Sequence, residues 1–240
     1  MRRLLRRAVT PVVALALLAA PGTAAPSPSP VAPPPATARP RGHALGIGEP
    51  RNPEPFTIAQ RLLDAVRRDD RPTVERALSR GAPIGARDDI GRGVVLLAVL
   101  DAGDLDLARW LHGRGAAVDE PDNGGRAALS YAAAAGRVDI VTWLLEEGAA
   151  VDRRDGQQRT ALFHAALGNH PEVIAVLLPR GADVNARDQW RDTPLIAACA
   201  KGNAAAAGFL LAHGADESLT DQEGRTARER AAPGLTVCRP

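Results

Sequence analysis

The stretch DQWRDTPLIAACAKGNAAAAGFLLAHGAD, residues 188–216, contains the pattern that decides the fold. Its first five residues are polar and typical of a turn, and Thr193-Pro194 can cap and open a helix. Residues 195–201 then predict a short alanine-rich helix that ends at Gly202. Residues 204–213 predict a second helix that ends at Gly214, since glycine readily adopts the left-handed conformation that terminates helices. The stretch therefore predicts a polar turn followed by two short helices.

The same pattern recurs along the chain with a step of 33 or 34 residues. Gly-Ala pairs begin at positions 81, 115, 148, 181 and 214. An aspartate recurs in phase with them, at Asp88, Asp122, Asp155, Asp188 and Asp221. Two unrelated markers that keep one period over five copies indicate an internal repeat. We expect each aspartate to stabilise a turn through its side chain.

The repeat resembles the ankyrin repeat in its motif residues. These are Thr193-Pro194-Leu195 with Ala197-Ala198, Thr160-Ala161-Leu162 with Ala165-Ala166, and the runs VIAVLLPRGADVNARD at 173–188 and IVTWLLEEGAAVD at 140–152. The resemblance covers roughly residues 56–232. It implies an all-α fold, an ankyrin-repeat solenoid of paired antiparallel helices with hairpin finger loops.

The chain departs from the family pattern in two respects. No copy has histidine after the Thr-Pro-Leu start, and His164 lies one residue beyond that position. The copy at Asp88 carries one extra residue near LDAGD, at 100–104, which predicts a local irregularity. We expect about four full units plus polar capping units at both ends, because an end unit has a neighbour on only one side.

The N-terminal sequence predicts export. Residues 1–25 have the basic, apolar and small-residue segments of a signal peptide, and the apolar stretch is too short for a spanning helix. Cleavage after Ala25 would leave no membrane-inserted segment, and an uncleaved anchor is the alternative. Residues 26–55 form a Pro/Ala-rich disordered linker, and 233–240 a C-terminal tail. The expected location is the periplasm or the cell exterior.

Charge and motifs argue against several function classes. The first seven residues hold four arginines, and without the predicted signal peptide the net charge changes from +2 to −2. No basic domain face for nucleic acid is therefore indicated. The five histidines do not recur at metal-ligand spacing, and no nucleophile or phosphate-loop motif occurs. We expect no catalytic residues, no metal and no cofactor.

Two cysteines raise the question of a disulfide in an exported protein. Cys199 lies in an alanine-rich helix, and Cys238 lies beyond the last unit. The favoured interpretation is one buried thiol and one free tail thiol. The alternative is a bridge that pins the tail onto the last units.

The three tryptophans fall at different repeat positions. Trp110 and Trp143 align with apolar positions of the second helix and are predicted core residues. Trp190 aligns with Ile90, Gly124, Gln157 and Glu223, which is not a core position. An exposed tryptophan beside arginines is typical of an interface anchor, and packing against the next finger is the alternative.

These positions predict a non-enzymatic scaffold, monomeric, that binds an unidentified partner protein through finger loops and the concave helical face. The predicted protein-binding residues are Trp190, Gln189, Asp192, Gln157, Arg159, Arg126, Tyr131, His164 and Lys201. The alternatives are an accessory regulator of one exported enzyme and a secreted host-directed effector.

Overall fold

A computed structural model describes residues 55–238, with side chains from residue 58. The predicted signal peptide and nearly all of the predicted linker lie outside these residues. The described part contains eleven α-helices and two short helical turns of other types. They are α1 (Pro55–Arg67), α2 (Arg71–Ser79), α3 (Val94–Leu97), the π-helical η1 (Ala98–Ala102), α4 (Leu105–His112), α5 (Ala128–Ala134), α6 (Val138–Glu146), α7 (Ala161–Leu167), α8 (Pro171–Leu177), the 3-10 turn η2 (Leu178–Arg180), α9 (Pro194–Lys201), α10 (Ala204–Ala212) and α11 (Ala227–Arg230).

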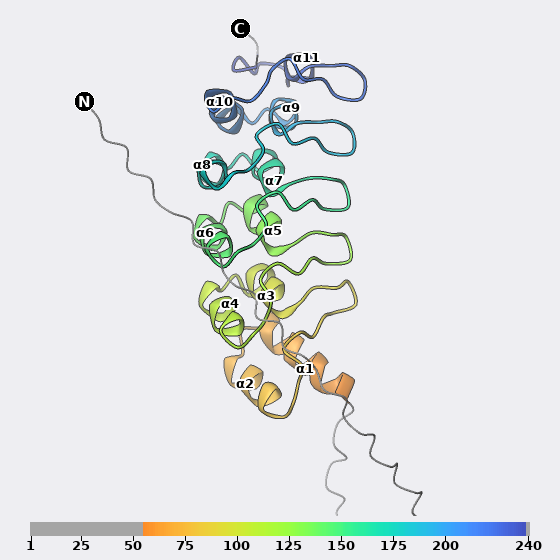
Figure 1. The fold of residues 1–240 in the computed structure, drawn as a ribbon, viewed down its shortest axis with the longest axis vertical. Helices are drawn as coiled ribbons and strands as arrows, with labels where there is room; N and C mark the ends of the chain where they lie inside the picture. Colours follow the sequence, from red (N-terminus) through yellow and green to blue (C-terminus); the bar gives the residue numbers. More distant parts are fainter. Residues whose placement is uncertain (1–54, 239–240) are drawn as a thin grey trace, which may run out of the picture. The chain divides into compact units, whose positions relative to one another are not determined.

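Within residues 55–238, the helices form consecutive antiparallel pairs that stack in chain order, from α1 and α2 to α9 and α10 (Figure 1). A loop projects from the stack between successive pairs, always on the side of the first helices α3, α5, α7 and α9. We call these loops fingers 1 to 5, centred on Asp88, Asp122, Asp155, Asp188 and Asp221. The described residues form no strand beyond isolated bridges, so the predicted all-α solenoid is confirmed.

Small side chains set the spacing between units. Helix α5 packs on α7, and α7 packs on α9. Their facing positions include Ala133, Ala166 and Ala198, all with no exposed surface. Alanine permits close approach of the helices and has the highest helix propensity, which suits helices of only seven or eight residues. Leucines and isoleucines such as Leu144 and Ile174 fill the space behind them.

Threonine caps begin three of the first helices. Thr160 accepts a hydrogen bond from the Phe163 amide at 3.3 Å, and Thr193 accepts one from the Ile196 amide at 3.2 Å. Thr226 forms a reciprocal capping box with Glu229, so even the four-residue α11 has a fixed start. The predicted cap at Thr193, with Pro194 in the first turn, is confirmed.

The irregularity predicted near residues 100–104 is also confirmed. Helix α3 continues into the π-helical turn η1, which ends at Gly103 with φ of +62°. A π-turn accommodates one more residue per turn than an α-helix. The extra residue of this copy is therefore absorbed within the first helix, and α4 keeps its place in the stack.

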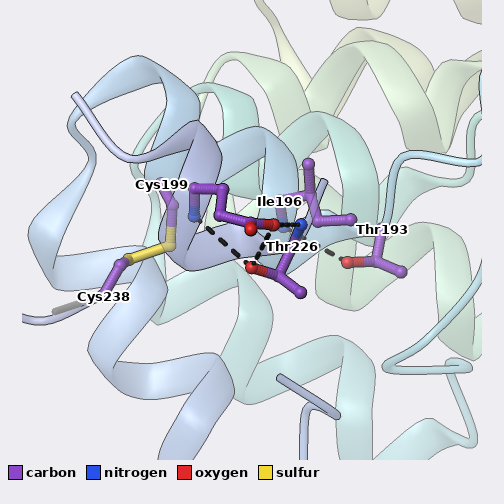
Figure 2. Close-up of a disulfide and its surroundings, with 6 residues drawn as sticks. Thr193, Ile196, Cys199, Thr226 and Cys238 are labelled. Atoms are coloured by element: carbon purple, nitrogen blue, oxygen red, sulfur yellow. Dashed lines mark hydrogen bonds between the residues drawn. A yellow bond between two sulfur atoms is a disulfide. The ribbon is translucent and has the colours of Figure 1, made fainter. Parts of the chain in front are cut away.

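The expectation of two free thiols is wrong, because Cys199 and Cys238 form a disulfide with Cα atoms 6.2 Å apart (Figure 2). The Cys199 side chain points from α9 into the protein core and is fully buried, as expected. The chain after α11 returns over it, where the Ala232 amide donates to the Cys199 carbonyl at 3.0 Å. Leu235 and Cys238 are both buried. Residues 231–238 thus cover the last helix pair.

Cys238→Ser should loosen this C-terminal end. The bridge spans 39 positions, and a closed loop of that length corresponds to about 4 kcal/mol of chain entropy in the unfolded state. Because a solenoid is stabilised by nearest neighbours, the change should be local. Hydrogen exchange should accelerate in α11 and residues 231–238 and remain unchanged in α5 and α6.

Wild-type protein treated with reductant serves as the control and should show the same exchange pattern as Cys238→Ser. Unaltered exchange at the C-terminal end in both samples would show that the bridge does not hold this end in place.

Candidate protein-binding site

In each finger, one carboxylate oxygen of the aspartate accepts two backbone hydrogen bonds that close the turn. In finger 4, Oδ1 of Asp188 accepts hydrogen bonds from the amides of Trp190 and Asp192, both at 2.9 Å. The aspartates of the other four fingers accept from the amides two and four residues ahead in the same way, at 2.8 to 3.2 Å. The turn-stabilising role predicted for these aspartates therefore holds in all five fingers.

The second carboxylate oxygen joins the finger to a helix, or in finger 4 to the preceding finger. Nine residues after the aspartate, in the first helix of the unit, Tyr131, His164 and Arg230 contact Oδ2 of their own aspartates at 2.7, 2.9 and 2.6 Å. Fingers 1 and 4 have an apolar residue at that position. There an arginine from the preceding unit replaces the contact, Arg67 at 2.7 Å and Arg159 at 3.5 Å.

His164 is 7% exposed and belongs to this internal network. Its Nε2 lies 2.9 Å from Asp155, which can only accept, so Nε2 carries the proton and Nδ1 faces Arg126 at 3.4 Å. Burial, reinforced by the Arg126 charge, lowers the pKa of His164 to about 4, although the contact with Asp155 opposes the shift. The histidine is neutral at pH 7. Burial also lowers the pKa of Arg126, against the nearby Tyr131, Asp155 and Asp122.

A backbone ladder joins the finger tips. The carbonyl two residues after each aspartate accepts from an amide of the next finger. The bonds are Asn123 to Ile90 at 2.9 Å, Gly156 to Gly124 at 2.7 Å, Gln189 to Gln157 at 3.0 Å and Gln222 to Trp190 at 2.9 Å. Each tip is consequently positioned by its neighbours, which favours a rigid row of side chains over independent loops.

Trp190 lies in this row with 40% of its surface exposed. Its amide is held by Asp188 and its carbonyl by Gln222. The guanidinium of Arg159, from finger 3, lies 5.1 Å from the centre of its ring. This contact comes from the preceding finger, so the alternative of packing against the next finger stays a prediction. In contrast, Trp143 is buried and Trp110 is half-buried, as predicted for core positions.

Two residues of the finger tips were missed by the sequence analysis. The position after Trp190 in the turn has positive φ in all five fingers, and fingers 1, 2 and 5 place glycine there. Fingers 3 and 4 place Gln158 and Arg191, with φ of +63° and +65°. A side chain in this conformation costs about 1–2 kcal/mol relative to glycine. Alignment of the five repeats could have identified Gln158 and Arg191, because theirs are the only two fingers without glycine at this position.

The predicted binding residues divide into three groups. Trp190, Gln189 and Gln157 are exposed on adjoining tips. Lys201 is exposed, but it ends α9, about 12 Å of helix away from the finger. The other side chains take part in packing: Arg126, Tyr131, Arg159 and Asp192 are half-buried, and His164 is buried. The expectation that His164 is presented on the concave face is wrong, because Asp155 and Arg126 hold it inside.

Among the described residues, no group of three or more histidine, cysteine or acidic side chains is arranged to hold a metal ion. None of the helices between residues 55 and 238 has the length and apolar character needed to cross a bilayer.

His164→Gln should weaken the pH dependence of stability. Below its ordinary pKa of about 6.5, the histidine of the unfolded chain binds a proton, whereas that of the folded chain binds one only near pH 4. The protein therefore becomes less stable as the pH is lowered from about 6.5 to about 4. The wild type should lose about 2 kcal/mol through this group between about pH 7 and about pH 5. Glutamine keeps a donor near Nε2 and does not titrate, so urea unfolding should show a smaller loss.

His213→Gln provides the matched control, since His213 is exposed at the end of α10. It should retain the wild-type pH dependence. Equal pH dependence in His164→Gln and wild type would contradict the account of the buried histidine.

Comparison with known proteins identifies the repeat. A family model described as "Ankyrin repeats (3 copies)" matches residues 62–155, 95–188 and 162–236. No curated protein matches the chain significantly. The matches together cover most of the sequence and coincide with the stacked helix pairs and fingers described above. The chain belongs to the ankyrin-repeat family.

Proposed function

We propose that this chain is an exported, non-enzymatic scaffold that binds a partner protein through the tips of fingers 3 and 4. Ankyrin repeats are protein-interaction scaffolds and are generally non-enzymatic. The observation that carries the proposal is the exposed ring of Trp190 on a tip that the aspartate turn and the ladder hold in place. A large side chain that is positioned before binding loses little conformational freedom in a complex.

The strained neighbours of Trp190 support the same surface. Gln158 and Arg191 occupy a backbone conformation that glycine adopts at lower cost, and neither side chain is buried. Retention of exposed side chains at such positions is typical of functional sites. Fingers 3 and 4 therefore combine three features that fingers 2 and 5 lack: an exposed aromatic ring, two strained turns and adjoining glutamines.

Two observations support export. The first 25 residues have the segments of a signal peptide. The Cys199–Cys238 disulfide suits an oxidising compartment, where such bonds form and persist. Intact-mass analysis of the protein recovered from an exported fraction should give a chain that begins at Pro26 and retains the disulfide.

Trp190→Ala should weaken partner capture while leaving the fold intact. The substitution removes the contact with Arg159, which at an exposed site contributes about 0.5–1 kcal/mol, so the melting temperature should change little. A hot-spot tryptophan contributes about 2 kcal/mol or more to binding, equivalent to a loss of about thirtyfold in affinity. Affinity capture from the exported fraction, followed by mass spectrometry, measures the first effect, and circular dichroism measures the second.

Ile90→Ala is the matched control. Ile90 is 53% exposed and occupies the same turn position in finger 1. It should retain capture of the partner that Trp190→Ala loses. Equal capture by wild type and Trp190→Ala would reject the proposed site, and a large fall in melting temperature would assign Trp190 to packing. Recovery of a single stoichiometric enzyme would make the scaffold an accessory regulator.

A further inference from the structure

Fingers 3 and 4 carry arginines whose charge is not balanced by nearby carboxylates. Arg154 donates to the carbonyls of Gln158 and Arg187, at 3.2 and 2.7 Å, and so bridges the two fingers without meeting an acid. Arg191 and Arg187 make no side-chain hydrogen bond or ion pair among the described residues. The charge of Arg187 helps to lower the pKa of Asp216, but the hydrogen bonds from Ser218 lower that pKa more.

The acidic residues of these two tips do not compensate for the arginines. Asp155 and Asp188 are buried and are committed to the turn amides. Asp192 is half-buried and lies 3.7 Å from Arg230. Arg159 already faces Asp188. On fingers 3 and 4 the exposed charges that meet no acid are therefore arginines, while the exposed Glu223 on the adjoining tip of finger 5 pairs with Arg225 and lies 3.9 Å from Arg230.

In fingers 1 and 5, the arginine four residues after the aspartate pairs with acidic side chains. In finger 1, Arg92 pairs with Asp88 at 2.8 Å and lies 3.7 Å from Asp101. In finger 5, Arg225 pairs with Asp221 at 3.0 Å and also with Glu223. Arg87 of finger 1, in register with Arg154, likewise donates to two carbonyls, those of Gly91 and Pro121. What distinguishes the surface around Trp190 is Arg191, an exposed arginine on the same finger tip that has no side-chain hydrogen bond or ion pair among the described residues.

We propose that the segment docking on fingers 3 and 4 is an acidic stretch of the partner protein that also presents an apolar side chain to Trp190. This inference rests on the proposed function and names the chemistry of its partner. Guanidinium groups bind carboxylates through paired hydrogen bonds, and an arginine without an internal acid is available for such a bond. Glu and Asp of the partner would meet Arg154, Arg187 and Arg191, while the apolar residue covers the tryptophan ring.

Short synthetic peptides test the partner class directly. Each combines several acidic residues with one leucine or phenylalanine, and each is matched by a peptide in which lysine replaces every acid. The wild-type chain should bind the best acidic peptide at least about tenfold more tightly than its lysine counterpart. Affinity should fall as salt is raised, because exposed charge pairs are screened.

The double variant Arg187→Gln/Arg191→Gln should bind that acidic peptide at least about tenfold more weakly. Arg76→Gln/Arg80→Gln is the matched control, since it removes two exposed arginines, one in α2 and one directly after it, away from the fingers, and should keep wild-type affinity. Arg191→Gly provides a second variant that should fold like the wild type, because glycine adopts the positive φ of this position without strain. It should bind more weakly with an unchanged or higher melting temperature.

Equal affinity for lysine and acidic peptides, absence of acidic-peptide binding, or unchanged affinity in the finger double variant would overturn the acidic-partner proposal. The capture experiment with Trp190→Ala separates this failure from failure of the proposed function. If Trp190→Ala still loses the captured partner, fingers 3 and 4 remain the binding site and only the chemistry of the partner is wrong.

Discussion

The hydrogen bonds of the aspartate in each finger are the interactions on which the rest of the structure depends. One carboxylate oxygen closes the turn by accepting two amides. The other contacts a helix in fingers 1, 2, 3 and 5 and Arg159 of the preceding finger in finger 4. Burial alone would raise the pKa of such a group. In Asp155, hydrogen bonds from the Arg159 backbone and from His164 outweigh burial, so its pKa lies below the usual range and the carboxylate stays charged. The finger is thereby a rigid extension of the helical stack.

This constraint makes the finger tips suitable for the binding role proposed for them, although they contain few apolar contacts. The aspartate turn fixes each tip internally, and the ladder of backbone hydrogen bonds fixes it to the next tip. Trp190 uses its backbone for both, and its side chain lies beside Arg159 with 40% of the residue's surface exposed. The strained conformations at Gln158 and Arg191 are tolerable for the same reason, because the surrounding bonds determine the turn. Structural order and exposed side chains thus arise from one arrangement.

The parts of the structure that repeat were predictable from the sequence, and the parts that occur once were not. The period, the paired helices, the threonine cap at Thr193 and the exposure of Trp190 all follow from register. The burial of His164 does not, because the histidine lies between Asp155 of its own finger and Arg126, which is 38 residues earlier in the chain. The disulfide depends on the return path of residues 231–238, for which the repeat provides no template. Arg191 and Gln158 lie between these cases, since comparison of the five turns would have singled them out.

Amide hydrogen exchange at Trp190 and Asp192 in two variants of Asp188 tests the role of the aspartate most directly. Asp188→Asn keeps an oxygen that can accept both amides, whereas Asp188→Ala removes it. We expect near-wild-type protection of both amides in Asp188→Asn, and fast exchange at both, with loss of partner capture, in Asp188→Ala. Slow exchange at these amides in Asp188→Ala would contradict this expectation, because the finger would then be held by something other than the buried carboxylate.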